Sequence, residues 1–114
     1  IQKTSNVSHQ NGSRFIVVII PTVVQVYETS YWNRIKRIYR LREEDYNLLL
    51  PNQFIRETCE TLGIDLFDAT PLLRRVASSD EGLYDPVNQH LNPYGHQLLA
   101  KGIVDYLREH QLVN

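Results

Sequence analysis

The sequence predicts an α/β fold in which a parallel sheet is covered by helices. Residues 15–20 read FIVVII, an apolar and mostly β-branched run that is typical of a strand buried on both faces. A second, shorter strand pattern, IDLFD, occupies residues 64–68 after a helical segment. The order strand, helix, strand, helix requires a right-handed crossover and therefore a parallel pair of strands.

The first twenty residues contain a polar segment and then the first strand. Residues 1–13 show no apolar periodicity and end in the turn signal Asn-Gly-Ser, so we expect a loop or the frayed end of a preceding element. The six apolar residues of the strand follow, and Pro21 closes it.

Residues 32–50 read as an irregular helix. Its rough apolar stripe consists of Trp32, Ile35, Ile38, Tyr39 and Leu41. Five basic residues fall within nine positions, and three acidic residues follow at once: Arg34, Lys36, Arg37, Arg40 and Arg42, then Glu43, Glu44 and Asp45. Two interpretations stay open, a basic binding patch and a solvated helix face that is neutralised by its own acidic neighbours.

Residues 51–77 predict a helix, the second strand and a short helix. Pro51 suits the first helical position, and Gly63 supplies a left-handed C-terminal stop. One face of this helix is expected to pack inward, and it carries Phe54, Ile55, Thr58, Cys59 and Leu62. After the strand at 64–68, the Thr-Pro pair at 70–71 opens a helix that reaches Val76.

The last helix has the clearest start signal in the chain. Asn92 can act as N-cap and Pro93 has its φ preset for the first position, so we expect a helix from there to about His110. Its apolar stripe consists of Tyr94, Leu98, Leu99, Ile103, Tyr106 and Leu107. Gly95 and Gly102 lie on the adjoining edge, where the missing Cβ lets a helix approach a sheet closely. We expect this helix to dock onto the sheet.

Length and composition bound the function classes. With 114 residues, 42% of them hydrophobic and 22% charged, the chain is expected to form one domain or less, and we interpret residues 1–114 as a fragment of a single domain. A net charge of -1 supplies no global field for nucleic acid or anionic lipid, so we expect no nucleic-acid partner. The longest apolar run is too short to cross a bilayer. Because the chain starts at Ile1 and contains no methionine, we expect a trimmed or excised part of a longer polypeptide.

Cys59 is the only cysteine, which excludes an internal disulfide and a multi-cysteine zinc site. On its helix face it is expected to be a small buried hydrophobe. A metal shared by the two histidines His90 and His96 would need a further ligand. The candidates are His9, Asp80 and Asp85, without a recognised metal spacing, so we expect no metal and no cofactor.

The two histidines stand in different places. His90 falls in the loop before the N-cap, at the carboxyl ends of parallel strands, where open α/β sheets place their active sites. An imidazole there can take a proton from a hydroxyl nucleophile and return it to a leaving group. An ordinary surface histidine is the alternative interpretation. His96 falls inside the first helical turn, where we expect a packing or hydrogen-bonding residue beneath the loop.

The segment around these histidines, DPVNQHLNPYGHQLLA at residues 85–100, resembles the C-terminal block of the GDSL/SGNH hydrolases. The segments FIVVIIPT and GIDLFDATPLL are similar to late strands of that family, each followed by a loop. The resemblance implies the C-terminal part of a flavodoxin-like, three-layer fold with a parallel sheet between helices. It also implies ester hydrolysis by a Ser-His-Asp relay, with His90 as general base, Gly95 as a helix-packing glycine and His96 without a catalytic role.

The chain departs from that family's pattern at two points. The family's histidine commonly follows an aspartate by two or three residues, but Asn88 and Val87 stand at those positions. We therefore consider four groups that could orient the ring: Asp85, Asn88, a backbone carbonyl or water. The alternative is a relay of serine and histidine without an acid. No Gly-Asp-Ser occurs, and no serine is expected in a strand-to-helix turn: Ser5, Ser8, Ser13, Ser30, Ser78 and Ser79.

The functional expectation is the C-terminal part of an SGNH-type serine esterase, lipase-like or acyl-transfer enzyme. It would be inert alone because the nucleophile and oxyanion donors are missing. Two strands are too few to protect so apolar a sheet, so we expect the remainder of a parent chain or a second copy to complete it, with homo-oligomers in solution. The rival expectation is a non-catalytic or degenerate α/β interaction domain that makes contact through residues 34–42.

Overall fold

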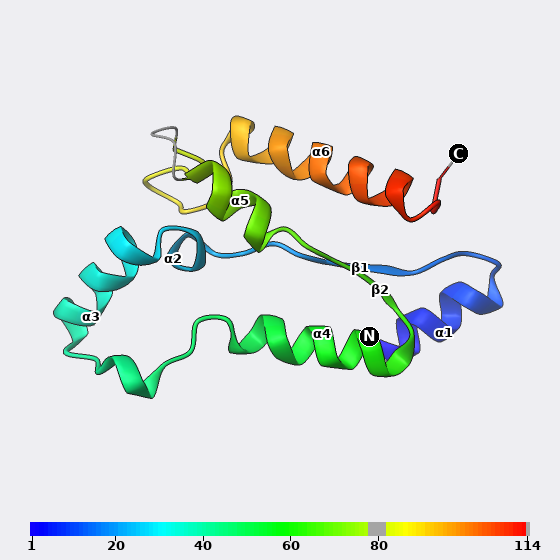
Figure 1. The fold of residues 1–114 in the computed structure, drawn as a ribbon, viewed down its shortest axis with the longest axis horizontal. Coiled ribbons are helices and arrows are strands. Elements are labelled where there is room, and N and C mark those ends of the chain that lie inside the picture. The colour runs from blue at the N-terminus through cyan, green and yellow to red at the C-terminus, as the bar shows by residue number, and fades with distance from the viewer. Residues whose placement is uncertain (78–81, 114) are drawn as a thin grey trace.

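The computed structural model describes residues 1–77 and 82–113 and contains both helices and strands (Figure 1). In chain order the elements are α1 (Gln2–Gln10), β1 (Ile16–Ile19), α2 (Val23–Val26), the π-helical segment η1 (Glu28–Trp32), α3 (Asn33–Tyr39), the 3-10 turn η2 (Glu43–Asp45), α4 (Leu50–Leu62), β2 (Asp65–Asp68), α5 (Thr70–Ala77) and α6 (Pro93–Glu109).

The two strands form a parallel pair, which confirms the predicted α/β class. Their register runs from Ile16 opposite Asp65 to Ile19 opposite Asp68, so both carboxyl ends lie side by side. The amide of Ala69 donates to the carbonyl of Ile19 at 3.0 Å and extends the pairing by one residue. In Figure 1 the strands run between α4 on one side and α5 and α6 on the other.

The hydrophobic core lies beside the carboxyl ends of the strands. Its buried members come from α2, α5, α6 and the segments next to them: Val26, Ala69, Leu73, Leu83 and Leu99. Burial of a side chain such as Leu73 contributes about 1.5–3 kcal/mol. The core therefore fixes the segments that leave the strands, and these segments carry the candidate site.

Helix α6 approaches the sheet closely at Gly102, as predicted, whereas Gly95 packs against Leu83 and Leu91 instead of the sheet. A Cβ on Gly102 would lie 2.5 Å from Cδ2 of Leu72 and 2.9 Å from Cζ of Phe67, which belong to α5 and β2. The ring of Phe67 also packs against Tyr106 with centroids 5.5 Å apart. Asn92 caps the helix, since its Oδ1 accepts a hydrogen bond from the amide of Gly95 at 2.9 Å.

The prediction for residues 1–13 was wrong, because residues 2–10 form α1. The segment lacks an apolar period, and six of the nine helical residues, those at 4–9, have only moderate helix propensity, so neither signal predicts this helix. The Asn-Gly signal marks the end of this helix: Asn11 donates from Nδ2 to the carbonyl of Val7 at 2.8 Å, and Gly12 adopts φ 69°. Ser5 is buried, although α1 is otherwise mostly exposed.

The segment 32–50 is irregular, as predicted, but its apolar stripe does not form a core face. Trp32 is buried, whereas Ile38 and Tyr39 are 61% and 69% exposed. Arg40 adopts the left-handed conformation with φ 53° and ends α3. The chain then passes through η2 before α4 begins, so the predicted long helix is broken into short pieces.

Helix α4 ends at Gly63 in the left-handed conformation, with φ 62°, as predicted. Cys59 is 1% exposed, which confirms it as a buried residue, and burial raises the pKa of its thiol. The prediction that Phe54 faces inward was wrong, since this ring is 70% exposed. Asn52 is buried on α4 instead, because polar partners from α2 and α5 meet it there.

Candidate functional site

The loop that carries His90 connects α5 to α6 and is tied to the carboxyl end of β1. Tyr84 and Leu91 form an antiparallel bridge that closes the loop at its base. The hydroxyl of Tyr84 donates to the carbonyl of Pro21 at 2.7 Å. Because Pro21 follows β1 by two residues, this bond places the base of the histidine loop beside the end of the sheet.

A second tyrosine fixes the same loop. Tyr27, which follows α2, accepts a hydrogen bond at its hydroxyl from the amide of Leu83 at 2.9 Å. Its ring meets that of Tyr84 edge to face, with centroids 6.1 Å apart and an angle of 79°. Burial, and then the neighbouring Tyr27, raises the pKa of Tyr84 to about 12, so its hydroxyl remains a donor at neutral pH.

The loop is also closed by its own main chain. The amide of Asp85 donates to the carbonyl of His90 at 2.8 Å, and the amide of Gln89 donates to the carbonyl of Asp85 at 2.9 Å. Gln89 adopts φ 61°, a conformation that a side chain with a Cβ rarely takes. The reversal at Gln89 turns the chain so that His90 comes back beside Asp85.

Two side chains hold this conformation. Oδ1 of Asp85 accepts hydrogen bonds from the amides of Val87 and Asn88 at 2.8 and 3.0 Å. Oδ1 of Asn88 accepts from the amide of His90 at 2.9 Å. The bonds from Asn88 and then Val87 hold the pKa of Asp85 below its usual value; partial burial opposes this effect, and the charge of His90 adds to it. Both candidate partners of the imidazole are therefore bonded to the loop backbone.

His90 is exposed, on a loop held by hydrogen bonds. Among the residues that the structure describes, no carboxylate oxygen lies within 4.0 Å of a ring nitrogen of this histidine. The ring is therefore open to solvent and free to exchange a proton with a group that approaches from outside the chain.

The interpretation of His96 as a residue packed beneath the loop was wrong, because its side chain is exposed. Helix α6 turns Gly95 and Leu99 toward the core, and this rotation leaves position 96 facing solvent. Only the backbone amide of His96 takes part in the cap, donating to the carbonyl of Asn92 at 2.9 Å.

Gly95 brings α6 close to the histidine loop. A Cβ at this position would lie 2.5 Å from the carbonyl oxygen of Leu83 and 2.9 Å from Cδ2 of Leu91. The backbone amide of Asn92 donates to the same carbonyl of Leu83 at 2.9 Å. Its side-chain Nδ2 donates to the carbonyl of Gly82 at 2.7 Å. Because Gly95 has no side chain, the first turn of α6 can pack against both ends of the loop, at Leu83 and at Leu91.

A buried polar network lies at the same end of the strands. Nε2 of Gln25 donates to Oδ1 of Asn52 at 2.8 Å, and Nδ2 of Asn52 donates to Oγ1 of Thr70 at 2.9 Å. Asp68 ends β2 and forms an ion pair with Arg56 at 3.1 Å. Sequence reasoning missed this network; the polar residues Gln25 and Asn52 in otherwise apolar or amphipathic helices were the available signal.

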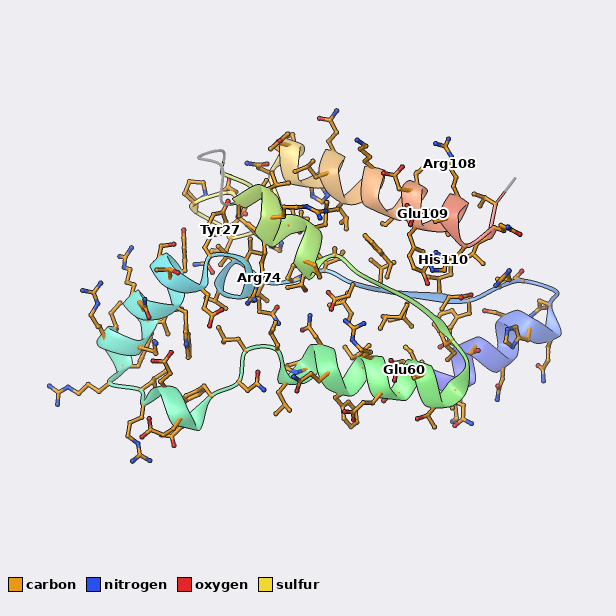
Figure 2. All side chains as sticks on the ribbon, viewed as in Figure 1. Tyr27, Glu60, Arg74, Arg108, Glu109 and His110 are labelled. Carbon is orange, nitrogen blue, oxygen red and sulfur yellow. The ribbon has the colours of Figure 1, made fainter. Side chains whose placement is uncertain are left out.

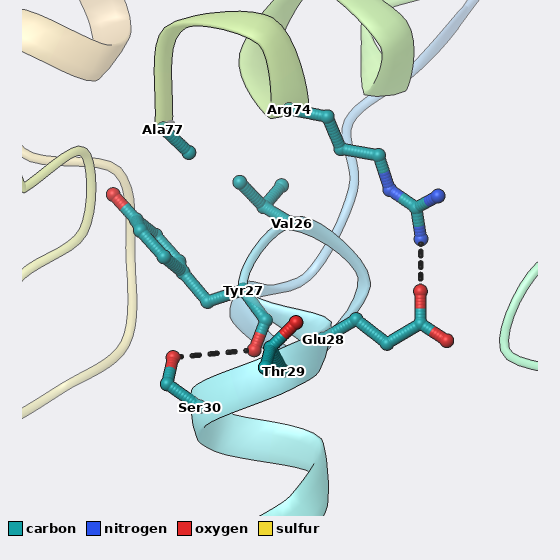
Figure 3. Close-up of a pocket in the computed structure, with 7 residues that line it drawn as sticks. All are labelled: Val26, Tyr27, Glu28, Thr29, Ser30, Arg74 and Ala77. Atoms are coloured by element: carbon teal, nitrogen blue, oxygen red, sulfur yellow. Dashed lines mark hydrogen bonds and ion pairs between the residues drawn. The ribbon is translucent and has the colours of Figure 1, made fainter. Parts of the chain in front are cut away.

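Arg74 of α5 joins this network to the segment after β1. Its Nε donates to the carbonyl of Gln25 at 2.6 Å and its guanidinium pairs with Glu28 at 3.1 Å. Figure 2 shows Arg74 and Tyr27 near the junction of α5 with α2. Both residues line a cavity of about 390 Å³, drawn in Figure 3, together with Val26, Glu28, Thr29, Ser30 and Ala77.

Among the described residues, no serine lies on the loop of residues 82–92 that carries His90. Ser5 and Ser8 belong to α1, and Ser30 belongs to η1, where its hydroxyl donates to the carbonyl of Tyr27 at 3.4 Å. Asp80, Ser78 and Ser79 lie outside the described residues. Within residues 1–77 and 82–113, no group of three histidine, cysteine or acidic side chains is placed to hold a metal ion.

No helix in the described part of the chain has the length and apolar character needed to cross a membrane. Comparisons of the chain with protein-family models, with curated proteins and with solved structures give no match.

Proposed function

We propose that this chain is the C-terminal part of an SGNH-type serine hydrolase, with a three-layer fold, and that it supplies the general base His90 for ester hydrolysis or acyl transfer. The observation that carries the proposal is the setting of this histidine. It is exposed, it stands on a loop tied by Tyr84 to the end of β1, and it lies two residues before Asn92, the cap of α6. Open α/β sheets bind their substrates at this end.

In this reaction the imidazole takes the proton of a serine hydroxyl as the oxygen attacks the acyl carbon. It then returns the proton to the leaving alkoxide. No carboxylate of the described residues lies within 4.0 Å of the ring nitrogens. In this structure no acid of the described residues contacts the ring, so the relay is either a Ser-His pair or a triad whose acid reaches the ring only in the complete enzyme.

On this proposal the serine and the oxyanion donors lie on polypeptide that packs against residues 1–114. The surface of the chain supports such a partner. A compact protein of 13.3 kDa exposes about 6,400 Å², whereas this chain exposes 8218 Å². Its radius of gyration is 16.3 Å, against about 13 Å for a compact domain of this length.

The test compares two histidines in the longer polypeptide that carries this sequence. Hydrolysis of a short-chain nitrophenyl ester should fall about 10²–10⁴-fold in His90→Ala, since a general base contributes that much. His96→Ala is the matched control, because this histidine is also exposed and stands six residues further along the chain. The 114-residue chain alone should show no turnover. Equal activity in both variants would contradict the proposal.

A second candidate function, a non-catalytic interaction domain, is favoured by the exposed face of α3. Ile38 and Tyr39 are exposed beside Arg34 and Arg37, which enter no ion pair among the described residues. Two other basic residues of the cluster are neutralised: Lys36 pairs with Glu43 at 3.2 Å, and Arg42 pairs with Asp45 at 3.0 Å.

This second function predicts salt-dependent binding of an acidic protein partner. The variant Arg37→Glu should abolish that binding, while His90→Ala should leave it unchanged. Binding that survives the reversal of charge at this position would remove α3 as the contact surface.

A further inference from the structure

We infer that Asp85 is a positioning residue for His90 and that it acts through the backbone of the loop rather than through the imidazole ring. This inference rests on the proposed function of His90. It assigns to Asp85 a role different from that of the acid in a Ser-His-Asp relay, whose carboxylate contacts the ring directly.

The contacts of Asp85 span the whole loop. Its carboxylate accepts two amides, from Val87 at 2.8 Å and Asn88 at 3.0 Å, and both bonds go to Oδ1. Its own amide and carbonyl bond to His90 and Gln89 at 2.8 and 2.9 Å. One residue therefore holds both the start and the end of the six-residue turn that presents the histidine.

The backbone at Gln89 gives a reason for this arrangement. Its φ of 61° is unfavourable for a residue with a Cβ, so the turn persists only where its surroundings hold it. Without the bonds to Oδ1 of Asp85, the amides of Val87 and Asn88 are no longer held in place, and these two residues directly precede Gln89. The ring of His90 would then sample many positions relative to an incoming hydroxyl, and a misplacement of about 1 Å can cost roughly 10²-fold in rate.

The substitution Asp85→Asn distinguishes a carboxylate that acts on the imidazole ring from one that acts through the loop backbone. An asparagine at position 85 keeps an oxygen at Oδ1 and can still accept both amides, but it has no charge. If Asp85 acted on the ring, the amide would lower kcat about 10⁴-fold, as in a triad whose acid is replaced. If it acts through the backbone, asparagine should replace it with little loss, whereas alanine cannot.

The experiment measures kcat and KM of the longer polypeptide with a short-chain nitrophenyl ester. We expect Asp85→Asn to retain kcat within roughly threefold, and Asp85→Ala to lose roughly 10–100-fold in kcat with little change in KM. Amide hydrogen exchange should show Val87 and Asn88 protected in Asp85→Asn and unprotected in Asp85→Ala, with α6 protected in both. Asp105→Asn, at an exposed position of α6, is the control and should behave as the wild type.

Two other outcomes separate the inference from the proposed function. A loss of activity in Asp85→Asn as large as that in His90→Ala would overturn the inference and make Asp85 the acid of the relay, while His90 would remain the base. Unchanged activity in His90→Ala would overturn both. If Asp85→Ala does not fold, the activity of Asp85→Asn alone still decides between the two roles.

Discussion

At the scale of single residues, the loop around His90 stabilises the charged form of one carboxylate, that of Asp85. Hydrogen bonds from two amides lower the pKa of Asp85, so the charged form is the one that the folded loop favours. For an acid with a lowered pKa, the stabilising contribution is complete above the pKa of the unfolded chain, about 3.9. It is lost as the pH falls through the lower, folded-state value.

This predicts that the protonation of Asp85 at low pH changes amide chemical shifts only in the loop. Amide chemical shifts of Val87 and Asn88, followed by NMR between about pH 6 and pH 2, should change together with a midpoint below about 3.9. The amides of Ile103 and Tyr106 in α6 serve as an internal reference. A midpoint at or above about 3.9 would show that these amides do not stabilise the carboxylate.

At the scale of elements, the two glycines of α6 allow a matched comparison. Gly95 lies against a backbone oxygen, whereas Gly102 lies against the ends of two side chains, which can move. Overpacking costs about 1–3 kcal/mol, and replacing a helical glycine with alanine returns about 1 kcal/mol. We expect Gly95→Ala to lower the free energy of unfolding by about 1–2 kcal/mol and Gly102→Ala to change it by less than about 1 kcal/mol. Urea denaturation of both variants checks this order, and a larger cost at Gly102 would contradict it.

The buried network at the end of the strands gives a second prediction for elements. Asn52 joins α2 to α5 through Gln25 and Thr70, so Asn52→Ala leaves buried polar groups without a partner. This change should lower the free energy of unfolding by about 1–3 kcal/mol. The neighbouring Gln53 is exposed, and Gln53→Ala should be nearly neutral in the same denaturation measurement. Equal effects would mean that the network does not contribute to stability.

The elements also show what sequence reasoning can and cannot supply. Both strands, the end of α4 at Gly63 and the cap at Asn92 were predicted, because each depends on local chemistry within a few residues. The inward position of Phe54 and the burial of His96 were wrong, because these depend on which face of a helix meets its neighbours. His90 stays a prediction as the central residue of the site. The tyrosine contacts that fix its loop leave no local signal, because they join positions 56 and 63 residues apart.

At the scale of the whole molecule, the dominant feature is a sheet that has only two strands in the described residues, so each strand has an edge that no other strand pairs. The molecule is elongated, with extents of 49 × 30 × 22 Å. Ile20, which directly follows β1, is 55% exposed. A strand edge with unpaired backbone groups and apolar neighbours is prone to pair with another chain. On our proposal, the rest of a longer polypeptide covers this strand edge, which no other strand pairs in the described residues.

We therefore predict that the 114-residue chain associates in solution. Static light scattering should give a mass above 13.3 kDa that rises with concentration. Addition of the remaining part of the parent polypeptide should reverse this association by covering the same edge. A constant mass of 13.3 kDa at high concentration would show that the sheet needs no partner.

The most direct measurement of the central claim, that His90 activates a serine outside residues 1–114, is the rate of covalent labelling by a fluorophosphonate. In the longer polypeptide, one serine outside these residues should form a bond to phosphorus as fluoride leaves. Its rate should fall about 10²-fold or more in His90→Ala and stay unchanged in His96→Ala. Labelling at the same rate in both variants, or at a serine within residues 1–114, would contradict this account.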